Sequence, residues 1–144
     1  MPSKYALIDI HTDGGSRGNP GPSGIGAYAT SGDDLVFTLS EKIGEATNNV
    51  AEYTAVFRAL ETIKERELTS DKLRFILDSE LIVRQITGIY KVKQPHLLEL
   101  RFQIVSLINL LKEQKIINNL SFMTVPRELN KDADRLVNEA LDMI

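Results

Sequence analysis

The sequence predicts one α/β domain whose five-stranded mixed sheet has helices on both faces, with elements in the chain order βββαβααβα. Two observations support this fold class. Three apolar segments near the amino terminus are separated by turn residues, which is typical of an antiparallel meander. Two later apolar segments alternate with amphipathic stretches, which predicts parallel strands joined by helical crossovers. We expect a single domain over residues 1–144, a length that supports its own hydrophobic core.

The first half of the chain is expected to supply three antiparallel strands and one helix. The strands are predicted at residues 4–12, 25–30 and 35–43, and the turn sequence "SGDD" separates the last two. An amphipathic helix is predicted from Asn49 to about residue 67, because apolar side chains recur there at helical spacing. These side chains are Ala55, Val56, Ala59, Leu60 and Ile63.

The second half is expected to add two strands and three helices. A short apolar strand is predicted at residues 73–78, followed by a short helix at 79–87. A longer apolar helix is expected to begin at Pro95, since proline is favoured in the first turn of a helix. The last strand is predicted at 120–125 and a closing helix at 130–144. The apolar stripe of the closing helix consists of Ala133, Leu136, Val137, Ala140, Leu141 and Ile144.

The composition excludes several kinds of site. The chain has no cysteine, so it forms no disulfide and no thiolate metal site, and a bound metal would rely mainly on oxygen ligands. No stretch approaches the ~20 apolar residues of a membrane span, and the amino terminus lacks a long apolar core. We therefore expect a cytoplasmic protein with no membrane partner. The net charge of −3 argues against a uniformly basic nucleic-acid binder but leaves room for a local basic surface.

Two acids stand where predicted strands end. Asp13 follows the first strand and Asp78 closes the fourth. In an open sheet, sites form at the carboxyl ends of parallel strands, so these carboxylates are candidates for function. Each acid also has a purely structural interpretation. Asp13 precedes two glycines and suits a turn, while Asp78 suits the amino-terminal cap of the helix that follows it.

Further acids come from the helices. Glu52 falls within the apolar stripe of its helix, where an unpaired carboxylate is costly, although a capping box with Asn49 is the structural alternative. In the closing helix Asp132 and Asp134 both flank the stripe, and their spacing does not choose between them. Acids that converge from several elements repel one another. They therefore indicate a site for hard divalent cations such as Mg²⁺, which suits phosphoryl transfer.

The stretches around these acids resemble the type I ribonucleases H from end to end. They read "TDGGSRGNPGPSGIGAY", "TNNVAEYTAVFRALE", "LDSELIVRQITG" with "YKVK", and "VPRELNKDADRLVNEAL". The resemblance implies the ribonuclease H-like fold and cleavage within the RNA strand of an RNA–DNA hybrid, leaving 3′-hydroxyl and 5′-phosphate ends. It also implies two Mg²⁺ ions per site with substrate bound, with Mn²⁺ as an alternative. By motif position, the catalytic and metal-binding residues are Asp13, Glu52, Asp78 and Asp134.

The same resemblance implies a set of substrate contacts. The three asparagines of this set would meet sugar hydroxyls of the RNA strand, and the threonine a phosphate of the DNA strand. The two lysines are candidate contacts for other phosphates. The expected substrate-binding residues are Gly14, Asn19, Thr47, Asn48, Asn49, Ser79, Lys91 and Lys93.

Two departures from the family pattern bear on this expectation. Many members carry a histidine shortly before the last acid, but "TVPRE" at 124–128 has none, so Arg127 and Glu128 are the candidate substitutes. The segment "GIYKVKQ" is shorter than the basic protrusion of larger members, so we expect a weaker or differently placed grip on the hybrid. A non-catalytic nucleic-acid-binding or assembly module is therefore kept as the alternative. We expect a monomer, with His11 packed beside the site and His96 at the surface.

Overall fold

Five strands form one mixed sheet in the computed structural model, which describes residues 4–143. They are β1 (Tyr5–Ser16), β2 (Gly21–Ser31), β3 (Asp34–Ala46), β4 (Ser70–Leu77) and β5 (Ile117–Thr124). Their order across the sheet is β3-β2-β1-β4-β5. The three strands from β1 to β3 pair antiparallel, whereas β1, β4 and β5 run parallel. The mixed sheet and the chain order of the predicted fold class are confirmed.

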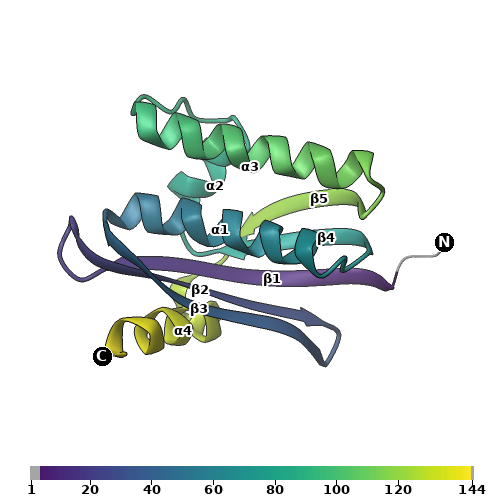
Figure 1. The fold of residues 1–144 in the computed structure, drawn as a ribbon, viewed down its shortest axis with the longest axis horizontal. Coiled ribbons are helices and arrows are strands. Elements are labelled where there is room, and N and C mark those ends of the chain that lie inside the picture. Colours follow the sequence, from purple (N-terminus) through teal and green to yellow (C-terminus); the bar gives the residue numbers. More distant parts are fainter. Residues whose placement is uncertain (1–3, 144) are drawn as a thin grey trace.

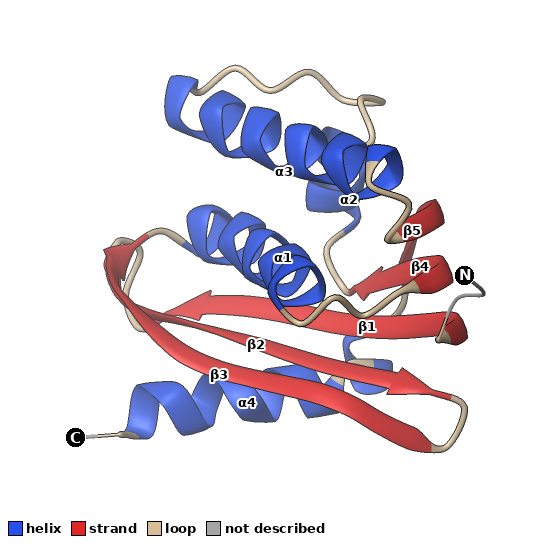
Figure 2. Cartoon of the chain, turned by 45° about the vertical axis from the view of Figure 1, so that its right-hand side comes forward, coloured by secondary structure: helices blue, strands red, loops and turns tan. Residues whose placement is uncertain are grey.

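Helices cover both faces of the sheet. They are α1 (Asn48–Glu65), α2 (Glu80–Ile86), α3 (Pro95–Glu113) and α4 (Lys131–Asp142), and a 3₁₀ turn (Arg127–Leu129) precedes the last of them. The first three lie on one face, with α3 farther from the sheet than α1, whereas α4 lies alone on the other face (Figure 1, Figure 2). Within residues 4–143, no helix is long and apolar enough to cross a membrane.

Alternation along β1 separates an apolar face from a polar one. Ile8 and Ile10 are fully buried in the core that the sheet forms with α1. Between them Asp9 points to the opposite face, where its carboxylate accepts hydrogen bonds of 2.6 and 3.1 Å from the Arg74 guanidinium on β4. Because side chains alternate along a strand, the next odd-numbered residues, including Asp13, belong to this second face, on which α4 packs.

β1 is longer than its apolar residues indicate. Pairing with β2 continues from Asp13 opposite Gly26 to Ser16 opposite Ser23, so Asp13 lies inside a paired strand. The strand continues past its predicted end at residue 12, and the structural alternative in which Asp13 belongs to a turn is wrong. The glycines that suggested a turn are strand residues at which other elements approach the backbone closely. The turn itself lies around Gly18, which has a positive φ of 93°.

The start of α1 also differs from the prediction. Thr47 caps this helix, because its hydroxyl oxygen accepts a hydrogen bond of 3.2 Å from the Val50 amide. Asn49 therefore lies inside the first turn, and the capping box between Asn49 and Glu52 is wrong. The Glu52 carboxylate is left without the structural role that competed with metal binding.

Two further helix predictions need correction. Ser79, and not Asp78, caps α2, since its hydroxyl accepts a hydrogen bond of 3.3 Å from the Ile82 amide. The closing helix begins at Lys131, and the Ile144 of its predicted stripe lies outside the described residues. Four other members of that stripe, Ala133, Leu136, Val137 and Ala140, are buried, and α4 packs mainly on β2 and also on β1 and β3.

Candidate active site

Adjacent parallel strands bring Asp13 and Asp78 together. His11 of β1 is paired with Ile76 of β4, so the two acids, each two residues farther along, stand at the same level of the sheet. Glu52 reaches the same place from the second turn of α1. One carboxylate oxygen from each of these three acids lies within 4.8 Å of the others. The structure therefore gathers three of the four predicted acids into one group.

The position of Glu52 depends on a glycine in β1. A Cβ atom at Gly14 would lie 2.3 Å from the carbonyl carbon of Ala51 and 2.5 Å from the Glu52 nitrogen. Such contacts are impossible, so only glycine lets the backbone of α1 approach β1 this closely. Ala51 is fully buried at the contact. Gly14 thus sets how near Glu52 comes to Asp13.

A second glycine lets α4 approach from the opposite face. A Cβ atom at Gly26, the partner of Asp13 in the sheet, would lie 2.3 Å from the Ala133 carbonyl oxygen and 3.0 Å from the Val137 nitrogen. The backbone of α4 therefore rests directly on the strand beside Asp13. This contact brings Asp134, the residue after Ala133, to the rim of the acid group.

The structure separates the two acids of α4 that spacing could not distinguish. Asp134 lines the same cavity as the three other acids, and its charge acts on Asp13. Asp132 does not line this cavity and lies 3.6 Å from the Arg135 guanidinium, on the exposed side of the helix. Asp134 is therefore the acid placed to complete the group, as the resemblance implies.

Burial and mutual repulsion make Asp13 and Glu52 harder to ionise. Burial, followed by the charges of Asp78 and Asp134, raises the pKa of Asp13 to about 7. Burial, followed by the charges of Asp13 and Asp78, raises the pKa of Glu52 to about 8, although Arg127 acts in the opposite direction. A cluster of partly buried carboxylates with this repulsion fits a hard divalent cation, which prefers oxygen ligands.

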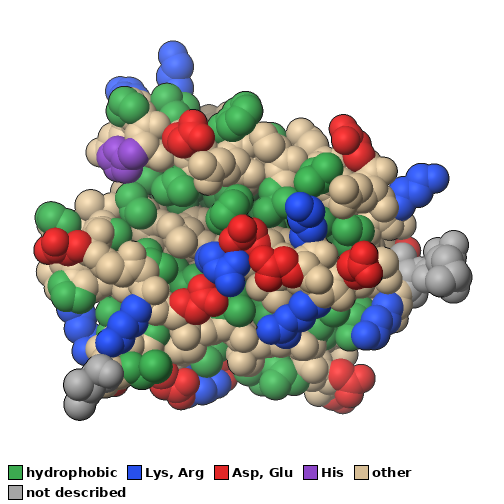
Figure 3. All heavy atoms as spheres, viewed as in Figure 1, with side chains coloured by type: hydrophobic (Ala, Val, Ile, Leu, Met, Phe, Trp, Pro, Cys, Tyr) green, Lys and Arg blue, Asp and Glu red, His purple; other side chains and the backbone are tan. Residues whose placement is uncertain are grey.

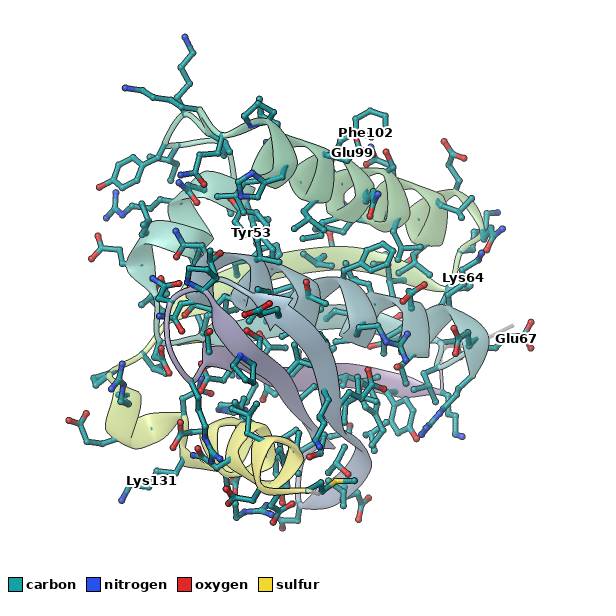
Figure 4. All side chains as sticks on the ribbon, turned by 60° about the vertical axis from the view of Figure 1, so that its left-hand side comes forward. Tyr53, Lys64, Glu67, Glu99, Phe102 and Lys131 are labelled. Atoms are coloured by element: carbon teal, nitrogen blue, oxygen red, sulfur yellow. The ribbon has the colours of Figure 1, made fainter. Side chains whose placement is uncertain are left out.

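The acids line a polar cavity of about 320 Å³. A larger cavity of about 400 Å³ lies between α1 and α3 and is mostly apolar. Figure 4 places Phe102 and Glu99 of that larger cavity on α3, and Figure 3 shows hydrophobic side chains gathered between the two helices. We assign the chemistry to the smaller cavity because it holds the acids. Its other lining residues include Gly14, Ser16, Arg17, Asn48, Arg127 and Asn138.

Two of the predicted substrate-binding asparagines are linked to each other. The backbone amide of Asn48 donates a hydrogen bond of 3.1 Å to the side-chain oxygen of Asn19. In turn, the Ser16 amide donates to the side-chain oxygen of Asn48 at 2.8 Å. These bonds tie the turn after β1 to the start of α1. Both residues are exposed, and Asn49 is partly exposed in the same helical turn.

The two predicted lysine contacts are not part of the acid cavity. Lys91 and Lys93 are exposed on the segment between α2 and α3. Lys91 lines a separate cavity with Tyr90 and Arg101, and the Arg84 guanidinium carbon lies 5.4 Å from the Tyr90 ring centroid. This segment lies on the same side of the molecule as the amino-terminal end of α1 (Figure 1). Lys91 and Lys93 thus form an exposed basic surface outside the acid cavity.

The structure adds one residue that sequence reasoning missed and locates three others. Asn130 is fully buried and its side-chain amide donates to Asp78, but as the first residue of a predicted helix it carried no signal beyond capping. Of the proposed histidine substitutes, Arg127 lines the acid cavity and Glu128 does not. His11 is partly buried outside the cavity, and burial lowers its pKa, which agrees with a packing role.

The metal-free protein should lose stability as the pH rises. Folding raises the pKa values of Asp13 and Glu52, so between about pH 4 and pH 8 the folded chain holds protons that the unfolded chain has released. We expect the free energy of unfolding in EDTA to fall by at least about 2 kcal/mol over this window. Urea unfolding followed by circular dichroism measures this change. A free energy of unfolding that does not vary with pH would contradict the raised pKa values of Asp13 and Glu52.

Known proteins resemble this chain over almost its whole length. A family model described as RNase H matches residues 6–142. The "Bifunctional protein Rv2228c" of Mycobacterium tuberculosis is 40% identical over 137 residues, which cover 94% of this chain and 35% of that protein. The chain thus spans about a third of the length of this relative. The ribonuclease HI of Halobacterium salinarum is 37% identical over 143 residues, covering 99% of this chain and 68% of that protein.

Solved structures agree with these matches. The ribonuclease H1 of Halobacterium salinarum has a TM-score of 0.85 at 37% identity, covering 95% of this chain and 98% of that one. The LC11 ribonuclease H1, solved in complex with an RNA/DNA hybrid, has a TM-score of 0.84 at 47% identity, covering 94% of this chain and 96% of that one. With the acid group at the centre of the matched fold, the chain belongs to the ribonuclease H family.

Proposed function

We propose that this protein is a metal-dependent endoribonuclease that hydrolyses the RNA strand of RNA–DNA hybrids, leaving 3′-hydroxyl and 5′-phosphate ends. The observation that carries the proposal is the meeting of Asp13, Glu52 and Asp78, with Asp134 lining the same cavity. Family membership and the hybrid bound in the 47% identical LC11 structure support the choice of substrate. We further propose that it acts as a single-domain monomer.

The acid group is the proposed metal centre. Asp13, Glu52 and Asp78 would hold Mg²⁺, or Mn²⁺ in its place, and Asp134 would serve a second ion once substrate is bound. Two such ions supply an activated water and neutralise the leaving 3′-oxygen. The chain itself contributes the rigid placement of the acids, because β1, β4 and α1 hold them before substrate arrives.

The exposed asparagines are suited to reading a sugar hydroxyl. The side-chain oxygens of Asn19 and Asn48 already accept backbone hydrogen bonds, which orients each amide group. Within residues 4–143 the amide nitrogens of both side chains have no hydrogen-bond partner, so they are available to donate to an RNA 2′-oxygen. Thr47 accepts the capping bond and keeps its hydroxyl hydrogen for a phosphate. This arrangement would distinguish RNA from DNA.

Arg127 has an electrostatic role in this proposal. It lines the cavity, and its positive charge opposes the rise in the pKa of Glu52. An arginine stays protonated at neutral pH and cannot shuttle a proton as a histidine does. We therefore propose that Arg127 stabilises a negative charge, either that of Glu52 or that of a substrate phosphate, and takes no part in acid–base catalysis.

Replacing Lys91 and Lys93 with alanine should weaken hybrid binding with little effect on the chemical step. We expect a higher KM for the hybrid at unchanged kcat, because both side chains are exposed and lie outside the acid cavity. The slope of log kcat/KM against log salt should become shallower by roughly one for each lost phosphate contact. The control is Lys112→Ala at the far end of α3, and a double variant that behaves like this control would contradict the assignment.

The proposed function is tested by incubating the protein with an RNA–DNA hybrid whose RNA strand carries an end label. We expect fragments with 3′-hydroxyl and 5′-phosphate ends in Mg²⁺ or Mn²⁺, and none in EDTA. A DNA duplex of the same sequence should remain uncut. Binding of the hybrid without metal-dependent cleavage would instead establish the non-catalytic module, which the missing loop histidine and the net charge of −3 favour.

A further inference from the structure

Asn130 lies where three of the active-site elements meet. It stands between the 3₁₀ turn and α4, and its side chain is fully buried. Its side-chain nitrogen donates to the Thr12 carbonyl oxygen at 2.9 Å and to Asp78 Oδ2 at 3.1 Å. Its own carbonyl oxygen accepts a hydrogen bond of 3.2 Å from the Asp134 amide. Asn130 therefore links Thr12, the residue before Asp13, to Asp78 and Asp134.

Helix capping does not explain the orientation of the Asn130 side chain. An asparagine before a helix normally accepts a hydrogen bond from an amide of the first turn, which stabilises the helix start. In Asn130 the side chain makes no such bond, and it turns inward instead. Its Oδ1 atom is buried and has no hydrogen-bond partner among residues 4–143. A buried polar atom left unpaired is costly, so the orientation must be held by the two bonds from the nitrogen.

The bond to Asp78 acts on a residue of the acid group. An amide hydrogen donates to one oxygen of this carboxylate and fixes the plane of the group. Within the described part of the chain, no other hydrogen bond restrains the Asp78 side chain. Carboxylates that bind metals are oriented by such partners, and removing the partner commonly weakens metal binding.

We propose that Asn130 is a positioning residue that orients Asp78 for divalent metal binding and couples its placement to β1 and α4. The inference rests on the proposed metal centre but concerns a residue outside it. Asn130 need not touch the metal, the substrate or the reacting phosphate. Its contribution is to keep Asp78 in the orientation that the three-acid group requires.

The test measures Mn²⁺ binding by isothermal titration calorimetry, without substrate. Asn130→Leu removes the donor while keeping a similar side-chain volume, and we expect a Kd about 10–100-fold higher than that of the wild-type protein. The matched control is Ser70→Ala, which removes the hydrogen bond of another fully buried residue, of 2.6 Å to the Lys72 carbonyl, at the opposite end of β4. This control should be less stable but should bind Mn²⁺ within about twofold of the wild-type protein.

The outcomes separate positioning from general stability. Asn130→Leu that is folded and binds Mn²⁺ within twofold of wild type overturns the proposal, as does an equal loss in Ser70→Ala. Should Asn130→Leu fail to fold, the smaller Asn130→Ala decides the question by the same criterion at a temperature where it is folded. The Mg²⁺ concentration for half-maximal hybrid cleavage should rise in step with the Kd, at an unchanged KM for the hybrid. Failure of the wild-type protein to bind Mn²⁺ would instead refute the proposed metal centre.

Discussion

Asp13→Asn should abolish hybrid cleavage while stabilising the metal-free protein. The substitution keeps the shape of the side chain but removes a charge that repels those of Asp78 and Asp134. We expect kcat to fall by at least about 10³-fold, since the charge stabilisation that the metal centre supplies to the transition state depends on this ligand. In EDTA at pH 8, loss of the repulsion should raise the free energy of unfolding by about 2–4 kcal/mol.

The opposite signs of these two effects are the informative part of the prediction. A residue needed only for folding would lose stability and activity together, whereas a ligand in a strained acid group loses activity and gains stability. Steady-state cleavage of a labelled hybrid and urea unfolding in EDTA measure the two quantities. The matched control is Asp132→Asn, because Asp132 is an exposed acid of α4 that lies outside the acid cavity. Equal losses of activity in both variants would contradict the assignment.

Gly26→Ala should uncouple α4 from the sheet. The new Cβ atom would lie 2.3 Å from the Ala133 carbonyl oxygen, so the helix must move or the strand must distort. We expect a loss of about 1–3 kcal/mol in the free energy of unfolding, the usual cost of overpacking a rigid contact. Asp134 would move with the helix, so kcat should fall on the order of 10²-fold even in the fraction that is folded.

Gly15→Ala provides the control for this steric argument. Its Cβ atom would meet Val137 Cγ1 at 3.4 Å, an ordinary contact with the same helix. We expect a change of less than about 1 kcal/mol in the free energy of unfolding for this variant. Thermal and urea unfolding of both proteins, followed by single-turnover cleavage, measure the contrast. Equal stability of the two variants would show that the close approach at Gly26 does not place α4.

The sequence predicted the order of elements because that order depends on local periodicity, and it predicted the meeting of Asp13 and Asp78 because both follow parallel strands. Apolar side chains with periods of two and 3.6 residues marked the strands and helices. The end of the first strand was harder, because Gly14 and Gly15 look like turn residues when contacts across the fold are not known. Gly14 serves close packing, which only the assembled sheet and helices reveal.

The same limit applied to the choice among acids and to Asn130. Asp132 and Asp134 differ by two positions on one helix, and their separation depends on how α4 lies against Gly26. Only the family resemblance chose Asp134 in advance. Asn130 looked like a helix start, and its buried contacts with Thr12 and Asp78 join residues more than fifty positions apart. No local pattern encodes such contacts.

The metal centre itself is the central claim, and a crystal structure with Mn²⁺ and a hybrid with a non-hydrolysable linkage tests it most directly. Anomalous scattering locates the ions without assumptions about their ligands. We predict two Mn²⁺ peaks within about 4 Å of each other, bridged by Asp13 and contacted by Glu52, Asp78 and Asp134. A bound hybrid with no Mn²⁺ at these acids, or with Mn²⁺ held only elsewhere, would contradict the account.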